Sequence, residues 1–420
     1  MTANNKNIDK QGNKLLNVPN LRFPEFEGEW EECLLKDVAE ISKGTGISKD
    51  QLSETGHPCI LYGELYTKYK SEVISEVLSR TNIENSNLVQ SKSNDVIIPS
   101  SGETAIDIST ARCVPFSNIL LGGDLNIIRL KEHDGCFLSY QLNGVRKLEI
   151  AKIAQGVSVV HLYGESLKRL KIKLPSIQEQ NKISSLLNLI DERIATQNRI
   201  IEKYESLIKG LCNELMDNSK WAKVYVGDFM EFFSTNSLSW EQLSYDNGQV
   251  RNLHYGLIHS GLPTIVDSLQ IPLPYIQDGY LPKQYTICKG GDIAFADASE
   301  DTVEVGKAIE ITNVGNNNII CGLHTIHGRD VKDMTIEGFK GFAFNTKYFH
   351  NQLRRVAQGS KVFSINAGNI RSCYLYIPPI FMQHKIVGLL TALQVKIQVA
   401  KQERHAYYLQ KQYLLKELFI

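Results

Sequence analysis

The sequence predicts an α+β protein in which two similar domains, each mixing helices and strands, are separated by two long antiparallel coiled-coil helices. Three observations predict this class. The chain has 420 residues, which is too long for one ordinary domain. Its second half repeats its first. Each half ends in a long segment with heptad spacing. Contents of 42% hydrophobic and 22% charged residues are typical of globular proteins.

In chain order, the first element is a polar tail at residues 1–18, which we expect to be disordered. It lacks the apolar core of a secretion signal, and no apolar run in the chain approaches the ~18 to 20 residues of a membrane span. The eight cysteines are scattered and form no Cys-x-x-Cys pair, so we expect no metal site, reduced thiols and a cytoplasmic location.

The repeat shows that two whole domains follow the tail, each with its own helix. From residue 154 to 217, each position n aligns without a gap to position n + 203, and 16 of these 64 pairs are identical. Upstream the match is gapped: LKDVAEI at Leu35 resembles VGDFMEF at Val226, and NDVIIPSSGET at Asn94 resembles GDIAFADASED at Gly291. We therefore predict a domain at 19–175, a helix at 176–217, a domain at 218–378 and a helix at 379–420, with the two halves related by a pseudo-two-fold axis.

Each helix begins after a proline, in LPSIQEQ at Leu174 and in IPPIFMQ at Ile377. Ser176 is predicted to cap the first helix with Glu179 closing a capping box, whereas the second copy has Met382 in place of that glutamate. Apolar side chains then recur in steps of three and four residues, the spacing of a coiled-coil seam. The seam residues expected at the helix and subunit interface are Ile183, Leu187, Ile190, Ile194, Ile201, Tyr204 and Leu211, and then Ile386, Leu390, Leu393, Ile397, Tyr407 and Leu414.

We expect the two helices to pair with each other in antiparallel orientation. Residues 176–217 carry five basic and seven acidic side chains, while residues 379–420 carry six and two, and opposite charge favours a mixed pair. Arg404 and Lys411 interrupt the second seam, and the antiparallel register could bring Gln197 near Arg404. Two separate helices, each packed on its own domain, remain the alternative.

The globular segments contain short strands and turns but no recognisable catalytic motif. LKRLKIKLP alternates apolar and basic residues, as an edge strand with one solvated face does. There is no phosphate-binding G-x-x-x-x-G-K-[ST], no dinucleotide-binding G-x-G-x-x-G and no G-x-S-x-G. His254 and His259 are five residues apart, a poor spacing for two metal ligands on one helix. Turn-rich loops instead carry Arg, Lys, Asn, Ser, Tyr and His, which can contact phosphates or base edges.

Taken together, these features resemble the DNA specificity (S) subunit of type I restriction–modification systems. The resemblance covers the chain from Pro19 onward and rests on the opening PNLRFPEFEGEW before LLKDVAEISKG, the AQG…LPSIQEQ junction, the heptad helix and the second pass through the same order. It implies a non-catalytic subunit in which each domain reads one half of a bipartite DNA target. The helices would set the spacer and dock two methyltransferase subunits, which restriction subunits then join.

The resemblance places S-adenosylmethionine, ATP and Mg²⁺ on the partner subunits and no cofactor on this chain. Within the target-recognition domains, our candidate DNA-binding residues are those of the polar and aromatic loops. They are Lys43, Thr45, Ser48, Tyr62, Tyr66, Lys68, Ser100, Ser101, Arg112, Arg251, Asn252, His254, Tyr255, His259 and Ser299. Two alternatives stay open, a coiled-coil scaffold with two ligand-binding domains and no DNA role, and a degenerate enzyme.

Overall fold

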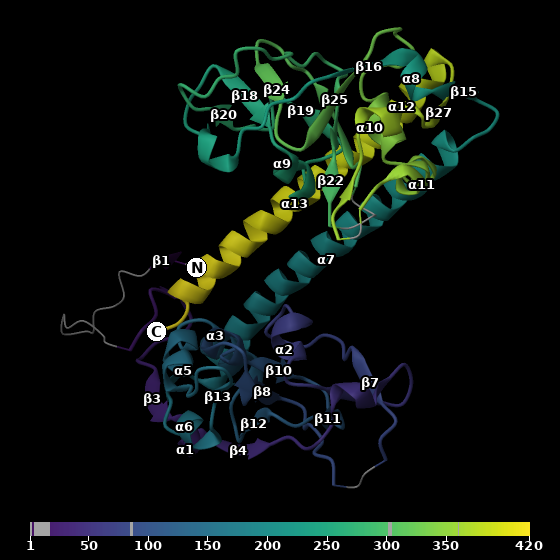
Figure 1. Cartoon of the computed structure of the whole chain (residues 1–420). Coiled ribbons are helices and arrows are strands. Elements are labelled where there is room, and N and C mark those ends of the chain that lie inside the picture. The colour runs from purple at the N-terminus through teal and green to yellow at the C-terminus, as the bar shows by residue number, and fades with distance from the viewer. Residues whose placement is uncertain (1, 4–16, 85–86, 301–304, 360) are drawn as a thin grey trace. The chain divides into compact units, whose positions relative to one another are not determined.

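The fold is known from a computed structural model, which describes residues 2–3, 17–84, 87–300, 305–359 and 361–420. The chain divides into two compact units. Unit 1 comprises residues 1–197 and 402–420, and unit 2 comprises residues 198–401. Each unit therefore contains one globular domain and a segment of both long helices, α7 (Ile177–Met216) and α13 (Ile380–Glu417) (Figure 1).

The elements of unit 1 are short. Its strands are β1 Thr2–Ala3, β2 Leu21–Arg22, β3 Glu31–Leu34, β4 Ala39–Lys43, β5 Leu52–Ser53, β6 His57–Ile60, β7 Ser79–Thr81, β8 Asp95–Pro99, β9 Ser101–Gly102, β10 Arg112–Val114, β11 Leu120–Leu121, β12 Leu125–Leu130, β13 Val160–His161 and β14 Lys171–Leu174. Its short helices are α1 Leu35–Val38, η1 Lys49–Gln51, α2 Glu64–Thr67, α3 Ala105–Ile108, α4 Gly135–Asn143, α5 Lys147–Ile153 and α6 Gly164–Leu167.

Two four-stranded sheets form the body of unit 1, with strand orders β10-β8-β12-β4 and β11-β6-β7-β5. The five residues of β8 are all buried, so this strand forms the centre of the core. The predicted edge strand is β14, which pairs only with β3 and keeps Ile172 and Leu174 buried while Lys171 is exposed. Most of the predicted tail lies outside the described residues, and Thr2–Ala3 within it pairs with Leu21–Arg22.

Unit 2 repeats this order with longer connections. Its strands are β15 Ala222–Tyr225, β16 Met230–Phe233, β17 Leu243–Ser244, β18 Val250–Leu253, β19 Ile265–Asp267, β20 Tyr275–Ile276, β21 Ile293–Ala296, β22 Ala298–Ser299, β23 Ala308–Thr312, β24 Asn318–Cys321, β25 Thr325–Asp330, β26 Phe363–Ser364 and β27 Tyr374–Ile377. Its short helices are α8 Val226–Phe229, η2 Trp240–Gln242, α9 Tyr255–His259, α10 Phe339–Phe344, α11 Lys347–Val356 and α12 Ala367–Arg371.

The sheets of unit 2 correspond to those of unit 1. The order β16-β25-β21-β23 matches β4-β12-β8-β10, with β19 added at the edge, and the second sheet has the order β17-β20-β18-β24. Both upstream repeats predicted from the sequence fall on corresponding elements. LKDVAEI and VGDFMEF form α1–β4 and α8–β16, while NDVIIPSSGET and GDIAFADASED contain β8–β9 and β21–β22.

The two long helices pair in antiparallel orientation within each unit. In unit 1, Asp191 and Gln197 of α7 contact Lys411 and Glu403 of α13, so the numbering falls on α13 as it rises on α7. In unit 2, Ile201 packs with Ile397 and Ala400, and Glu205 pairs with Lys401. All thirteen predicted seam residues are buried or partly buried. The Gln197 side chain donates a hydrogen bond to Glu403, which is the neighbour in sequence of Arg404, the residue predicted to lie near Gln197.

The repeated junctions are explained by one glutamine in each copy. The side-chain amide of Gln180 donates to the Pro175 carbonyl over 2.8 Å and its oxygen accepts from the Asp134 amide over 3.1 Å. Gln383 donates to the Pro378 carbonyl over 3.0 Å and accepts from the Ile336 amide over 2.9 Å. Both glutamines are fully buried, so each fastens the start of a long helix to the loop before α4 or α10.

The predicted capping box at the start of α7 is only half correct. The Ser176 hydroxyl accepts from the Glu179 amide over 3.3 Å, as an N-cap does. The Glu179 carboxylate, however, turns to the Arg22 guanidinium, with two contacts of 2.8 and 2.7 Å. Because both side chains are buried, this bidentate pair ties β2 to the helix, and charge pairing replaces the expected contact to the backbone.

The interrupted seam of α13 is compensated within unit 1. The Lys411 ammonium contacts the carboxylates of Glu72 and Asp191, and Asp191 also accepts from the Tyr140 hydroxyl over 2.7 Å. Beyond it, Leu414, Leu418 and Phe419 enter the main core of unit 1. Among the described residues, no helix is long and apolar enough to cross a membrane.

Candidate nucleic-acid interface

The same short motif forms a half-buried corner in each unit. β6 pairs in parallel with β11 and β18 pairs in parallel with β24, which makes Ile60 the counterpart of Leu253. The Gly122 amide donates to the Ile60 carbonyl and the Gly322 amide donates to the Leu253 carbonyl, each over 2.9 Å. Each strand is then followed by Tyr-Gly and a short helix. We call Tyr62, Gly63 and Tyr66 in unit 1, and Tyr255, Gly256 and His259 in unit 2, the Tyr-Gly corners.

In unit 2 the corner lies inside a group of aromatic rings. Ring centroids are 4.6 Å apart for Trp240 and His254, 4.7 Å for His254 and Tyr255, and 5.2 Å for Tyr255 and His324. Trp240 and His324 are exposed, whereas His254 is buried beneath them. The group therefore presents an indole, a phenol and an imidazole on one surface, with flat faces for stacking and polar edges for hydrogen bonds.

Two hydrogen bonds fix this ring group to the β21–β22 segment. A ring nitrogen of His259 lies 3.2 Å from the Ala298 carbonyl, and one of His324 lies 3.1 Å from the Asp297 carboxylate. His254 is the N-cap of α9, because its Nδ1 accepts from the Gly256 amide over 3.1 Å. Burial lowers the pKa of His254 from its ordinary value, and nearby His324 lowers it further, so the neutral imidazole is favoured.

In unit 1 the corner has tyrosines at both positions. Tyr62 and Tyr66 are half-buried, and the Tyr66 hydroxyl lies over Gly63 and Gly102. Burial raises the pKa of Tyr66, with further increases from Tyr62 and the carboxylates of Asp107 and Glu103. Beyond β9, the exposed His161 ring stacks on Tyr163 at 6.1 Å. The two corners thus share a backbone but differ at Tyr66 and His259, and in their neighbours.

The structure separates the other predicted DNA-binding residues into exposed and buried sets. Lys43 and Ser48 are exposed, and Ser299 of β22 is half-buried. Thr45, Lys68 and Arg251 are engaged within the fold. Thr45 bonds to the 87–89 backbone, Lys68 forms an ion pair with Glu64, and Arg251 contacts the Ser268 carbonyl and Tyr275.

Five predicted contacts are corrected because their side chains are buried. Arg112 is 7% exposed, and its guanidinium donates to the carbonyls of Leu65 and Tyr69, which stabilises the end of α2. Ser100, Ser101, Asn252 and His254 are also buried, so they support the corners from below. The sequence indicates which loops carry polar side chains. It does not indicate which of those side chains the fold buries.

Trp240 and His324 were not predicted. Trp240 lies 15 residues before Tyr255 and His324 lies 69 residues after it, and no local motif marks either of them. His324 has the positive φ of 53° that Asp124, its counterpart before β12, has at 58°. The turn before β12 recurs before β25, and this repeat was the signal that could have located His324.

A duplicated ion pair supports the equivalence of the two units. Arg129 contacts Asp95 over 2.8 and 2.7 Å, and Arg329 contacts Asp292 over 2.8 and 2.6 Å. Asp95 also accepts from the Lys92 amide, as Asp292 does from the Lys289 amide. The same bonds recur at the same places in both units, so unit 2 is a second copy of unit 1 and not merely a domain of the same class.

Known DNA specificity proteins are similar to this chain. The family model for the type I restriction modification DNA specificity domain matches residues 27–206. The putative type I restriction enzyme MjaX specificity subunit of Methanocaldococcus jannaschii is 20% identical over 407 residues, which is 92% of this chain and 92% of that protein. Residues 27–206 match the type I DNA specificity domain, and nearly the whole chain is similar to a type I specificity subunit.

A second curated relative matches one half of this chain. The type I restriction enzyme MjaVIII specificity subunit, from the same archaeon, is 24% identical over 219 residues, and this match spans 50% of this chain and about half, 48%, of the relative. The fold is also that of the crystal structure of the type I restriction-modification S subunit from M. genitalium. The TM-score is 0.62 at 16% identity, over 96% of this chain and 99% of that one.

Proposed function

We propose that this chain is a non-catalytic DNA specificity subunit in which each unit recognises one half of a bipartite target. The observation that carries the proposal is the pair of Tyr-Gly corners. The two units build the same corner from the same backbone, but they present Tyr66 in one and His259 in the other. A shared frame with different half-buried polar groups at its surface is what two readers of different half-sites require.

The chemistry of the corners suits bases better than phosphates. Tyr and Trp rings stack on bases, and imidazole and phenol groups can donate to or accept from base edges. The two globular segments have little excess charge, with 21 basic and 22 acidic groups in residues 1–175, and 14 and 15 in residues 218–378. We therefore propose that partner subunits supply much of the phosphate neutralisation. A steep salt dependence of DNA binding by the isolated chain would contradict this part of the proposal.

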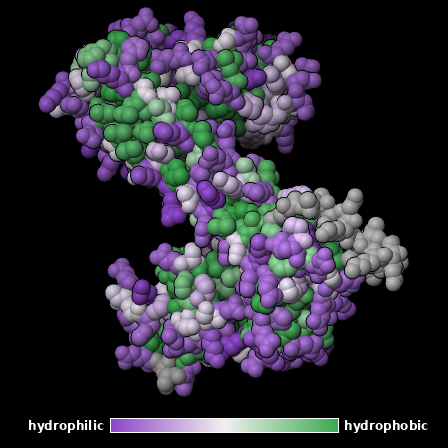
Figure 2. All heavy atoms as spheres, turned by 180° about the vertical axis from the view of Figure 1, so that it is seen from behind, coloured by the Kyte–Doolittle hydropathy of each residue, from purple (hydrophilic) through white to green (hydrophobic). Residues whose placement is uncertain are grey.

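The long helices are proposed to dock two methyltransferase subunits, which restriction subunits then join. S-adenosylmethionine, ATP and Mg²⁺ would be bound by those partners. The supporting observation is a short exposed apolar stripe on α13, formed by Val395 and Val399, which lie one turn apart and are 57% and 48% exposed. Figure 2, a view of one face of the molecule, shows hydrophobic residues gathered in patches among hydrophilic ones. Apolar groups at helical spacing that the fold itself leaves uncovered are suited to a partner surface.

We further propose that α7 and α13 set the number of unread base pairs between the half-sites. Seven residues can be inserted into each of the two helices at positions that face each other. The apolar seam then stays on the same side of each helix, because the pattern repeats every seven residues. Such a variant should methylate the same two half-motifs with a longer gap. An unchanged gap would contradict a spacing role without affecting the assignment of the readers.

The central experiment is to express the chain with its cognate modification subunit and map methylated adenines by long-read sequencing. A split motif with a fixed gap is expected. Tyr62→Ala should relax one half of the motif and Tyr255→Ala the other, while Tyr285→Ala, an exposed tyrosine outside the corners, should change neither. If both corner variants leave the motif intact, the corners are not the readers. If a competent partner gives no sequence-specific methylation, a scaffold without a DNA role becomes the better interpretation.

A further inference from the structure

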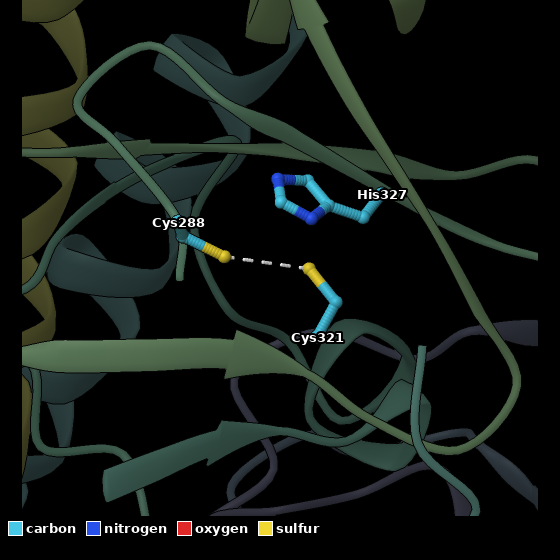
Figure 3. Close-up of side chains that lie close together, drawn as sticks. All are labelled: Cys288, Cys321 and His327. Atoms are coloured by element: carbon cyan, nitrogen blue, oxygen red, sulfur yellow. Dashed lines mark hydrogen bonds between the residues drawn. The ribbon is translucent and has the colours of Figure 1, made fainter. Parts of the chain in front are cut away.

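Unit 2 contains a buried group of two thiols and an imidazole that the DNA-reading role does not use. Cys288 lies before β21, Cys321 ends β24 and His327 lies in β25. The two sulfur atoms are 3.6 Å apart, and all three donor atoms lie within 4.8 Å of one another. Figure 3 shows the imidazole edge turned toward both sulfur atoms. All three residues are at most 2% exposed.

The imidazole is held from behind by a carboxylate. His327 Nε2 lies 2.7 Å from Asp292 Oδ2, while the same ring has a nitrogen within 4.8 Å of the Cys288 sulfur. Asp292 is itself held by Arg329. A histidine that ligates a metal almost always gives its second ring nitrogen to a carboxylate or carbonyl, which fixes the tautomer and the ring orientation. That outer support is already present here.

Unit 1 shows that the fold does not need these three groups. The counterparts of Cys288, Cys321 and His327 are Ser91, Leu121 and Ile127, as the aligned Lys92, Gly122 and Arg129 indicate. Leu121 and Ile127 belong there to an ordinary apolar cluster. Unit 2 therefore has metal-binding side chains where unit 1 has two core hydrophobic residues and a serine, and both units keep the Asp–Arg pair.

We propose that Cys288, Cys321 and His327 form a binding site for a thiophilic d¹⁰ cation, with Zn²⁺ as the representative ion. Two thiolates about 2.3 Å from a tetrahedral zinc ion lie about 3.8 Å apart, close to the 3.6 Å separation observed. Three protein ligands leave the fourth position to water or another small ligand. The ion would join β24 and β25, which belong to different sheets of unit 2.

The strand register favours a metal over a disulfide. Ile287 is bridged in antiparallel fashion to Ile320, so Cys288 and Cys321 are diagonal neighbours on one face. The Cα atoms of such neighbours are about 7–8 Å apart, whereas a disulfide needs about 4.4–6.8 Å. A metal spans this gap without moving the backbone. Sequence spacing could not reveal the site, because its ligands come from three separate elements.

The test is zinc content and affinity of the full chain. Protein purified from zinc-supplemented medium is passed through a weak chelator, and zinc per chain is measured by mass spectrometry. Co²⁺ titration then reports thiolate ligation through sulfur-to-cobalt charge-transfer absorption. We expect one equivalent per chain, and loss of both the ion and the absorption band in Cys321→Ser and His327→Gln.

The chain supplies two matched controls. Cys113 and Cys136 in unit 1 also have sulfur atoms close together, at 3.4 Å, but no histidine completes a metal-binding group with them among the described residues. Cys113→Ser should keep the full equivalent of zinc. The triple variant Cys288→Ser/Cys321→Leu/His327→Ile copies unit 1 and should fold, as judged by circular dichroism, without binding zinc. Three results would overturn the proposal. The native chain could fail to retain zinc, Cys321→Ser could retain as much zinc as the native chain, or Cys288 and Cys321 could form a disulfide instead of binding the ion.

Discussion

The ammonium group of Lys411 lies 2.5 Å from a carboxylate oxygen of Asp191, and this buried ion pair joins α13 to α7 within unit 1. In the sequence, Lys411 reads as a defect in a heptad seam. In the structure, Glu72 and Asp191 surround it, and the Tyr140 ring lies beneath it at 5.5 Å. In the repeat, Ile208 occupies the position of Lys411 and packs against the core of unit 2. The two helix ends are therefore not interchangeable.

Lys411→Met should destabilise unit 1 strongly. It leaves Glu72 and Asp191 buried without a cation, and breaking a buried pair in this way costs about 3–5 kcal/mol. Denaturant unfolding monitored by tryptophan fluorescence measures the loss. Lys401→Met removes the solvent-exposed pair with Glu205 and should cost at most about 1 kcal/mol. Equal losses in the two variants would show that burial of Lys411 has no energetic consequence.

Gln383→Ala should loosen the start of α13. It removes the acceptor for the Ile336 amide and the donor to the carbonyls of Met334 and Pro378. Each buried group left unpaired costs about 1–3 kcal/mol. Faster hydrogen exchange at Ile336 and a lower free energy of unfolding are the measurements. Gln402→Ala on the exposed face of the same helix is the control, and Gln180→Ala should reproduce the loss in unit 1.

The ring group of unit 2 should weaken in mild acid. The pKa of His254 is lowered in the folded protein, so its stabilising contribution is fully present above the unfolded value of about 6.5. That contribution is lost as the pH falls through 6.5 toward the folded pKa, because the unfolded chain binds the proton first. The free energy of unfolding, measured against pH, should decline in this window.

The variant His254→Asn should remove that part of the decline while keeping an acceptor for the Gly256 amide. His405→Asn on the exposed face of α13 is the matched control and should leave the pH profile unchanged. If His254→Asn titrates like the native chain, another group carries the pH dependence.

The exposed stripe on α13 should be dispensable for folding but required for docking. The pair Val395→Lys and Val399→Lys changes exposed positions, so the free energy of unfolding should stay within about 0.5 kcal/mol of the native value. Co-purification of the modification subunit should be lost, because two charges would have to be desolvated in the interface. Lys396→Ala, on a neighbouring exposed residue, should still co-purify. Undiminished capture by the double variant would place docking elsewhere.

The sequence predicted the architecture well because duplication and heptad spacing are long-range patterns. From residue 154 onward the copies align without gaps, and the predicted helices at 176–217 and 379–420 are observed as Ile177–Met216 and Ile380–Glu417. Upstream, loops of unequal length shift the register. Tyr62 corresponds to Tyr255, an offset of 193 residues, whereas Asp95 corresponds to Asp292, an offset of 197. The equivalence of the two corners is visible only once the strands are paired.

The candidate site was predicted less well because burial is decided by tertiary packing. Tyr62, Tyr66, Tyr255 and His259 lie at the corners, but Arg112 faces inward and supports α2. Its residue type suggested a DNA contact, yet its buried guanidinium donates to three backbone carbonyls. Trp240 and His324 reach the ring group from other elements, η2 and the turn before β25, and no spacing rule connects them to Tyr255.

The placement of Leu414, Leu418 and Phe419 has a consequence for biosynthesis. Phe419 lies 5.1 Å from Phe137 and 6.4 Å from Trp30, ring centroid to centroid, inside the core of unit 1. The unit that leaves the ribosome first is therefore completed last, after all of unit 2 has been translated. Until then Trp30 and Phe137 lack their final neighbour, and a nascent chain that stalls or is cleaved before residue 414 leaves unit 1 with an open hydrophobic core.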